Sequence, residues 1–309
     1  GQRIMLLIKY TLLYAMVLML VALGGCFSEH SGIINIALEG IMTIGGLVGI
    51  AMLVVMPAGT SNSVILLVSI GAAGLSGILY SALLAFASIN LKADQTIGGT
   101  ALNLLATALA VVIARRFNTG TQAAKLSYSN APFIYNIGGL TVNIFLFIGI
   151  ALLLLSIFIM YRTRFGLRLR ACGEHPQAAD SVGINVYHMR WWGVLISGFL
   201  GGIGGFAYIV PAVQTWNFEV GVAGMGFLAL AVMIFGQWKP GRIFFAAMFF
   251  AVFKALANIA DSTFLAALGW PKEIYNMMPF IASMIILAFT SKKSRAPKAE
   301  GIPYDKGSR

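Results

Sequence analysis

The feature that most constrains this chain is a series of apolar runs, each about as long as a lipid bilayer is thick. A helix that rises about 1.5 Å per residue needs about 20 apolar residues to cross a hydrocarbon core of about 30 Å. Such runs recur along the whole chain, and 59% of its 309 residues are hydrophobic while only 10% are charged. The sequence therefore predicts an integral membrane protein without a separate soluble domain.

Nine runs are long enough, or nearly so, to span the membrane. They lie near residues 5–24, 33–56, 64–90, 97–115, 139–160, 191–211, 223–238, 243–260 and 274–290. The seventh is short and flanked by glycines, so we expect a tilted, broken or re-entrant helix, which needs protein or water around its open backbone. Because the alternation of a membrane β-barrel is absent, the predicted fold is an all-α, polytopic transmembrane helical bundle of about nine spans, with residues 1–309 as one domain.

Basic residues predict the orientation, because Lys and Arg concentrate in cytoplasmic loops. If the loop 161–190 is cytoplasmic, nine spans also place the positions around Lys92, the turn 239–242 and the basic tail 291–309 there. This assignment collects 14 of the 21 Lys and Arg. It puts the N-terminus outside and the C-terminus in the cytoplasm. The net charge of +11 then reflects topology and anionic membrane lipids, and no nucleic-acid-binding motif is present.

No motif for catalysis or metal binding is recognisable in the chain. Phosphate-loop, zinc-protease and nucleophile-elbow motifs are absent, and the three histidines lack ligand-like spacing. Cys26 and Cys172 fall on opposite sides of the predicted membrane, so we interpret both as packing residues. The run that ends at Cys26 also resembles a lipoprotein signal, but the chain re-enters the membrane directly after it. We therefore expect no enzyme and no bound metal.

Glycines recur at helical spacing in two of the predicted spans. Gly71, Gly74 and Gly77 share one side of the third span, and Gly198, Gly201, Gly202 and Gly205 share one side of the sixth. Missing side chains let helix backbones approach closely within a membrane. The spacing therefore predicts helix packing at these positions.

Polar side chains inside the spans are costly in hydrocarbon and need a partner or water. Asn35 and Glu39 are four residues apart and are predicted to share one helical face, and Asn103 lies inside the fourth span. These residues either fix the bundle by hydrogen bonding or line a polar pathway for a hydroxylated solute. Lys254 is expected to pair with Asp261 at a helix end.

One long polar segment, RACGEHPQAADSVGINV at residues 170–186, interrupts the apolar pattern. Residues 176–182 begin with proline and stop at Gly183, which predicts one short helix. Two helical turns are unstable alone in water, so the end of the bundle or a groove in another protein must hold them. A solvated loop whose arginines anchor at lipid headgroups explains the arginines but not the helix signal.

This segment resembles the loop of ABC-importer permeases in which Glu, an Ala-Ala pair and Gly surround the coupling helix that seats in a cleft of the cytoplasmic ATPase. Three further segments, LGGCFSEHSGIINIALEGIM, ADQTIGGTALNLLA and GMGFLALAVMIFGQWKP, resemble in this order the permeases for nucleoside and simple-sugar uptake in bacteria. The likeness runs from about residue 10 to 260. Lys239 departs from it, since a less charged turn is expected there.

The resemblance implies a type II importer in the bacterial inner membrane, in which this chain is the non-catalytic permease that moves nucleosides or simple sugars by alternating access. It implies a second, paralogous permease, an ATPase that carries ATP and Mg²⁺, and an extracellular solute-binding lipoprotein. The residues that would take part in ATPase coupling are Arg170, Glu174, Ala178, Ala179, Asp180 and Gly183. Asn35, Glu39 and Asn103 lie in matched segments and are candidates for lining or shaping the translocation path.

The main rival hypothesis is a secondary transporter or channel driven by an ion gradient. Intramembrane charges and a broken helix suit that hypothesis, although it gives the short helix no use. A membrane enzyme would need a catalytic constellation that the sequence lacks. The polar outer loop 116–138 is a candidate docking surface for the binding protein, with Thr119, Thr121, Gln122, Ser127 and Asn130 as its polar residues.

Overall fold

The structure is a computed structural model that describes residues 1–118, 120, 123–260, 264–290 and 294–307. Its helices are α1 (Gln2–Ser31), α2 (Leu38–Val55), α3 (Asn62–Ala85), α4 (Gln95–Phe117), α5 (Ile144–Arg162), α6 (Arg164–Glu174), α7 (Pro176–Ser181), α8 (Val186–Ile209), α9 (Met225–Phe235), α10 (Pro240–Asn258) and α11 (Lys272–Thr290). Its strands and short 3-10 or π segments are β1 (Lys125–Ser127), β2 (Ile134–Ile137), β3 (Leu140–Asn143), β4 (Thr215–Asn217), η1 (Phe86–Asn90), η2 (Ala131–Phe133), η3 (Phe218–Val220) and η5 (Phe264–Leu268). Asp261, the predicted partner of Lys254, and the predicted loop residues Thr119, Thr121 and Gln122 lie outside the described residues.

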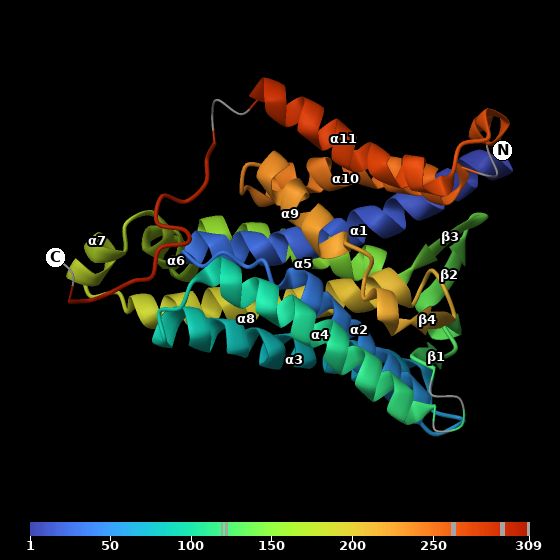
Figure 1. The fold of residues 1–309 in the computed structure, drawn as a ribbon, viewed down its shortest axis with the longest axis horizontal. Helices are drawn as coiled ribbons and strands as arrows, with labels where there is room; N and C mark the ends of the chain where they lie inside the picture. Colours follow the sequence, from blue (N-terminus) through green and yellow to red (C-terminus); the bar gives the residue numbers. More distant parts are fainter. Residues whose placement is uncertain (119, 121–122, 261–263, 291–293, 308–309) are drawn as a thin grey trace.

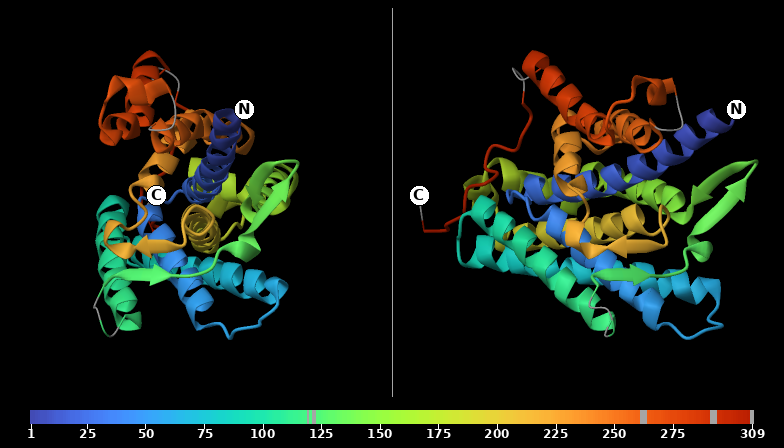
Figure 2. Two further views of the ribbon diagram at one scale, coloured as in Figure 1. Left: turned by 90° about the vertical axis from the view of Figure 1, so that its right-hand side faces the viewer. Right: turned by 45° about the vertical axis from the view of Figure 1, so that its right-hand side comes forward.

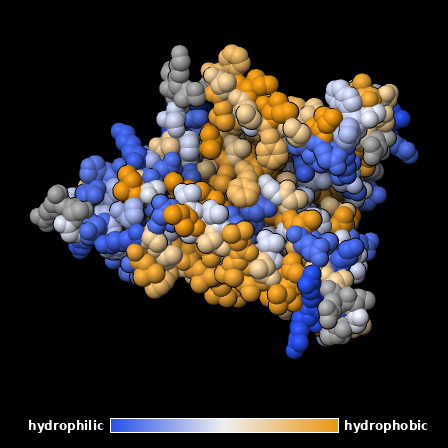
Figure 3. All heavy atoms as spheres, viewed as in Figure 1, coloured by the Kyte–Doolittle hydropathy of each residue, from blue (hydrophilic) through white to orange (hydrophobic). Residues whose placement is uncertain are grey.

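The long helices form a bundle with two distinct ends (Figure 1). The N-terminus and the strands lie at one end, and α6, α7 and the C-terminus lie at the other. Within the described residues, eight helices are long and apolar enough to cross a membrane, with α3 and η1 together forming one of them. Figure 3 shows apolar side chains across the middle of one face and hydrophilic residues toward both ends. The prediction of an all-α, multi-pass membrane bundle is confirmed.

α9 corresponds to the seventh predicted span. It has 11 residues, fewer than the roughly 20 that a full crossing needs. It begins inside the bundle, where its first turn lies against the start of α2. This short helix agrees with the prediction of a tilted, broken or re-entrant helix near 223–238.

α8 is the central helix, and its neighbours surround it in the end-on view of Figure 2. Its glycine-rich surface packs against α1, α2 and α3. A Cβ atom on Gly77 of α3 would overlap the carbonyl oxygen of Gly198, and one on Gly205 would overlap that of Met42. The predicted glycine contact between these spans is confirmed at Gly77, whereas Gly71 has open space beside it.

The first two predicted spans have different boundaries in the structure. α1 extends past the predicted span 5–24 and includes Cys26, which is buried, so the run that resembles a lipoprotein signal belongs to the core. The predicted span 33–56 starts too early, because residues 32–37 are irregular and α2 begins only at Leu38. Side chains of other helices satisfy the backbone of that irregular segment, as described below.

Four short strands cover one end of the bundle. β1 pairs antiparallel with β4, with Lys125 opposite Asn217. β2 pairs with β3 through the turn Gly138–Gly139, in which both residues have positive φ, as a two-residue hairpin turn requires. The predicted span 139–160 was wrong at its start, because hairpin pairing takes its first residues and α5 begins at Ile144.

The glycine contact between α3 and α8 leads to a stability prediction. Gly77→Leu would place a side chain against the backbone of α8, and overpacking of this kind costs up to about 3 kcal/mol. We expect a lower melting temperature in detergent and less folded protein in the membrane. Gly71→Leu, on the same helix with no atom within 4 Å of its would-be Cβ, is the matched control and should change stability by less than about 0.5 kcal/mol. Equal melting temperatures for the two variants would contradict the packing role.

Candidate functional site

Two irregular segments lie inside the bundle. The first break, residues 32–37, joins α1 to α2, and the second break, the turn 221–224, follows η3 and precedes α9. Within a membrane such backbone persists only where other groups satisfy its N–H and C=O. Polar side chains from neighbouring elements fulfil this requirement at both breaks.

Amide side chains of α4 hold the first break. Asn103 donates from Nδ2 to the carbonyl oxygen of Ile36 at 2.9 Å and accepts at Oδ1 from the N–H of Gly40 at 2.8 Å. Gln95, about two turns earlier on the same helix, accepts at Oε1 from the N–H of Ile34 at 2.8 Å. Together they replace the hydrogen bonds that a continuous helix would have supplied.

Asn35 lies inside the first break and not on a helix. Its side chain is completely buried, and Nδ2 donates to the hydroxyl of Ser197 on α8 at 2.7 Å. Because α2 starts only after it, Asn35 and Glu39 do not share a helical face, which corrects the prediction from their spacing. Asn35 instead ties the break to the central helix, while Glu39 reaches toward α9.

Glu39, on α2, caps the start of α9 where the second break ends. Its Oε1 accepts from the N–H of Gly224 at 2.8 Å, and its Oε2 accepts from the N–H of Gly226 at 2.7 Å. The first N–H groups of a helix lack partners within it, and a carboxylate there also meets the positive end of the helix dipole. A Cβ on Gly226 would come within 2.6 Å of the Cα of Glu39, so glycine permits this approach.

The three pathway candidates, Asn35, Glu39 and Asn103, therefore lie around the two breaks and form hydrogen bonds within the chain. These contacts favour the interpretation that they fix the bundle. Their positions determine where α2 and α9 begin. These residues would therefore influence a translocation path by fixing where α2 and α9 begin.

At one end of the bundle, α7 matches the short helix predicted at 176–182. The Nδ1 of His175 accepts from the N–H of Ala178 at 3.1 Å and caps its start. Gly183, with φ of 91°, follows its end in the left-handed conformation that glycine adopts readily. The proline, the cap and the glycine together define this short helix.

α6, which precedes α7 in the loop 161–190, was missed by the sequence interpretation. The hydroxyl of Thr163 caps its start by accepting from the N–H of Gly166 at 3.2 Å. Phe165, Leu169 and Cys172 recur at the spacing of one helical face, and Leu169 and Cys172 are buried. This cap and this apolar spacing are the signals that predict α6.

The predicted coupling residues separate into two groups around α7. Glu174 and Ala178 are exposed, together with Val182, whose side chain has 76% of its surface exposed. Ala179 is buried against the bundle, and Asp180 lies 3.8 Å from the Nζ of Lys306 in the C-terminal segment. Val182 was not among the predicted residues, although an apolar residue just beyond a polar helix could have indicated it.

Arg170 and Cys172 lie on the inner side of α6. The guanidinium of Arg170 stacks over the ring of Tyr161, with its carbon 5.1 Å from the ring centroid. Burial raises the pKa of the Cys172 thiol to about 11, so it stays neutral at physiological pH. Both residues therefore support the packing of α6, and Cys172 agrees with its predicted packing role.

The turn between α9 and α10 is strained and held by α1. Gln237 and Trp238 both have positive φ, near 52° and 55°, which is uncommon for residues with bulky side chains. The indole N–H of Trp238 donates to the carboxylate of Glu29, and the Nε2 of His30 lies 2.6 Å from the Trp238 carbonyl oxygen. These contacts define the turn at Lys239 that the sequence left in doubt.

A family of transport permeases matches most of the chain. The family model described as "Branched-chain amino acid transport system / permease component" matches residues 7–288. The chain belongs to this family. Membership in this permease family confirms the resemblance drawn from the sequence, and it favours the importer over the gradient-driven transporter.

Two relatives of this permease align with it over almost their full lengths. The nucleoside ABC transporter permease protein NupC of Lactococcus lactis subsp. cremoris (strain MG1363) is 39% identical over 99% of this chain and 98% of its own. The guanosine ABC transporter permease protein NupQ of Bacillus subtilis (strain 168) is 37% identical over 100% of this chain and 99% of its own. NupB, a nucleoside ABC transporter permease protein of the same Lactococcus strain, is 29% identical over 60% of this chain and 53% of its own.

The capping contact of Glu39 predicts a large stability effect. Each hydrogen bond to a charged group contributes about 1.5–3 kcal/mol, so Glu39→Ala should lower the free energy of unfolding by about 3 kcal/mol or more. Thermal unfolding in detergent measures this change. Glu219→Ala is the control, because its carboxylate forms only an exposed pair with Arg115 at 3.6 Å, and it should cost less than about 1 kcal/mol. Similar losses in both variants would show that the cap contributes little.

Proposed function

We propose that this chain is the membrane permease subunit of an ATP-driven ABC importer for nucleosides, and that it holds no catalytic group of its own. The family match and the two full-length relatives support the transport role, and the relatives' names support the substrate class. Simple sugars are the second substrate class that the sequence resemblance raised. ATP and Mg²⁺ bind to a partner ATPase.

The observation that carries the proposal is the exposed surface of α7 and of the residues that flank it. Glu174, Gln177, Ala178 and Val182 form this surface, which we call the coupling face. A large exposed apolar side chain flanked by small and polar ones fits a helix that lies in a groove of another protein. The coupling face is therefore proposed as the docking surface for the ATPase.

The proposed mechanism transmits motion from α7 into the bundle. Closure of the ATPase upon ATP binding displaces α7, and α8 follows it after the short turn 182–185. The side-chain oxygen of Asn185 accepts from the N–H of His188 at 3.2 Å and caps α8, so the turn and the helix move together. Because α8 is central, its displacement reaches α1, α2 and α3. ATP and solute must each bind the two resulting states unequally to drive transport.

The proposed orientation places α6, α7 and the C-terminus in the cytoplasm and the strands outside, in the inner membrane of a bacterium. The excess of basic residues at the end that holds α6, α7 and the C-terminus supports this orientation. The strands would then face an extracellular solute-binding lipoprotein. The presence of two nucleoside ABC transporter permease proteins in one Lactococcus strain supports a second, paralogous permease beside this one.

Capture of the partner chains tests this proposal. The tagged chain is purified from its native membranes in a mild detergent, and the bound proteins are identified by mass spectrometry. We expect an ATPase and a second permease with the unchanged chain. Ala178→Asp should reduce the captured ATPase by about tenfold, because a charge at the coupling face would have to be buried unpaired.

Ala131→Asp provides the matched control, because Ala131 is also exposed but begins η2, directly before β2. The strands lie at the opposite end of the bundle from α7 (Figure 1). This variant should retain the ATPase fully. The proposal fails if the unchanged chain captures no ATPase while its bundle stays folded. Equal losses from Ala178→Asp and Ala131→Asp would refute the location of the coupling face.

A further inference from the structure

The C-terminal segment Ser294–Gly307 has no helix or strand, yet the bundle holds it along its length. The N–H of Ala299 donates to the carbonyl oxygen of Gly173 at 2.8 Å, and the N–H of Gly301 donates to that of Gly32 at 3.1 Å. The guanidinium of Arg190 on α8 donates to the carbonyl oxygen of Ile302 at 2.9 Å. We call this segment the strap, because it joins the end of α6, the start of the first break and α8.

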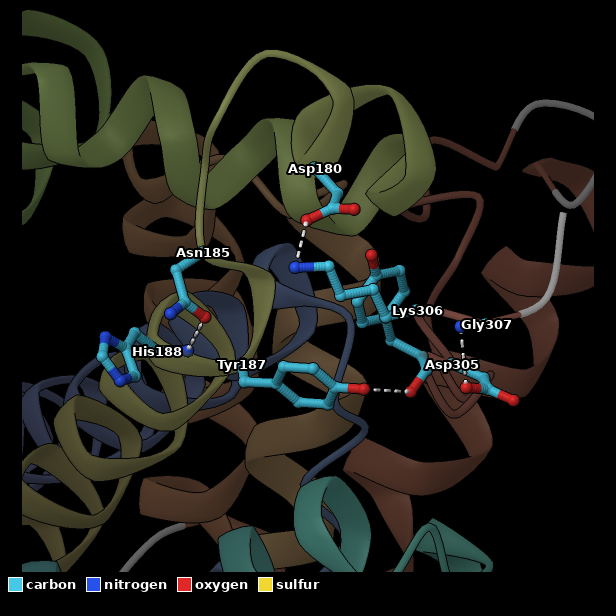
Figure 4. Close-up of polar contacts among 8 residues, drawn as sticks. Asp180, Asn185, Tyr187, His188, Asp305, Lys306 and Gly307 are labelled. Atoms are coloured by element: carbon cyan, nitrogen blue, oxygen red, sulfur yellow. Dashed lines mark hydrogen bonds and ion pairs between the residues drawn. The ribbon is translucent and has the colours of Figure 1, made fainter.

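The far end of the strap lies against α7 and the start of α8 (Figure 4). The Nζ of Lys306 lies 3.8 Å from the carboxylate of Asp180, and the rings of Tyr304 and Tyr187 have centroids 5.3 Å apart. On the other side, the carboxylate of Asp305 lies 3.1 Å from the Nζ of Lys92, beyond α3. One short segment therefore contacts elements from four separate parts of the chain.

Tyr304 is the buried residue at this end of the strap. Burial and the nearby Asp180 raise the pKa of Tyr304 to about 12, so its phenol keeps its proton at physiological pH. The N–H of Gly307 and the ammonium of Lys92 lower the pKa of Asp305, which keeps that carboxylate ionised. The charged pairs are exposed and individually weak, whereas the ring of Tyr304 is anchored. The strap can thus follow α7 without being fixed to it rigidly.

We propose that the strap couples α7 to the first break, and that Tyr304 and Lys306 are positioning residues for the transport cycle. The inference rests on the proposed function, because it assumes that an ATPase moves α7. A displacement of α7 pulls on the strap through Asp180 and reaches Gly32, where the strap is hydrogen-bonded at the start of the first break. This route runs beside the direct one through α8, to which the strap is also bound at Arg190 and Tyr187. It connects the cytoplasmic contact with a break inside the bundle.

The test uses the complete importer, with its ATPase, second permease and binding protein, reconstituted in lipid vesicles. ATP hydrolysis and uptake of radiolabelled guanosine are measured in the same vesicles. Tyr304→Ala and Lys306→Ala should leave ATPase binding intact and reduce the guanosine taken up per ATP hydrolysed by about threefold or more. Lys298→Ala, an exposed basic residue in the middle of the strap, is the control and should retain the ratio of the unchanged importer.

A cysteine pair tests the coupling without weakening the contact. Asp180→Cys with Lys306→Cys, joined by a short thiol cross-linker, should keep the transport ratio near that of the unchanged importer, because the strap moves with α7. Cys26 and Cys172 are buried and should not react under native conditions. Loss of transport upon cross-linking would mean that the strap and α7 must separate, which would overturn the proposal.

The remaining outcomes separate the two proposals. Unchanged transport ratios in Tyr304→Ala and Lys306→Ala, in an active importer, would overturn the role of the strap alone. Loss of ATPase binding in these variants would also overturn it, because the strap would then belong to the docking surface. If the importer with the unaltered chain hydrolyses ATP but takes up neither guanosine nor a simple sugar, the proposed function is wrong. The role of the strap, which rests on that function, would then be wrong too.

Discussion

The structure depends on the need to satisfy every backbone polar group that lies away from water. Two helices start inside the bundle, and each start leaves N–H groups without partners. Glu39 supplies a carboxylate for α9, and Asn103 supplies an amide for the segment before α2. Without these side chains, the N–H and C=O groups at both places would stay unpaired away from water, which costs free energy. The positions at which α2 and α9 begin would then no longer be fixed.

A second constraint comes from the glycines of α8. Because helices in lipid gain little from hydrophobic burial, they associate where their backbones can come close. Gly198 and Gly205 allow α3 and α2 to approach the central helix on different sides. The resulting contacts involve backbone atoms, which, unlike side chains, have no alternative rotamers. Helices joined in this way tend to move as units, which suits a subunit that has to pass a displacement from one end to the other.

Much of the fold could be predicted from the sequence, because long apolar runs and glycine spacing are local signals. The short helix α7 was equally readable from Pro176 and Gly183. The first break could not be predicted, because Asn35 and Glu39 have helical spacing. Their partners Ser197 and Gly224 lie far along the chain, and only these contacts show that the two side chains point in different directions. The contact of Asp180 with Lys306 was hidden for the same reason, because two exposed charges far apart in sequence carry no signal of proximity.

The turn at Trp238 combines two opposing effects in one residue. Its left-handed backbone would be relaxed by glycine, but glycine has no indole to reach Glu29 on α1. A large aliphatic or phenylalanine side chain would keep the strain and lose the donor. Substitution is therefore penalised in both directions, so this position should vary little as related chains diverge, even though no solute or nucleotide needs to touch it.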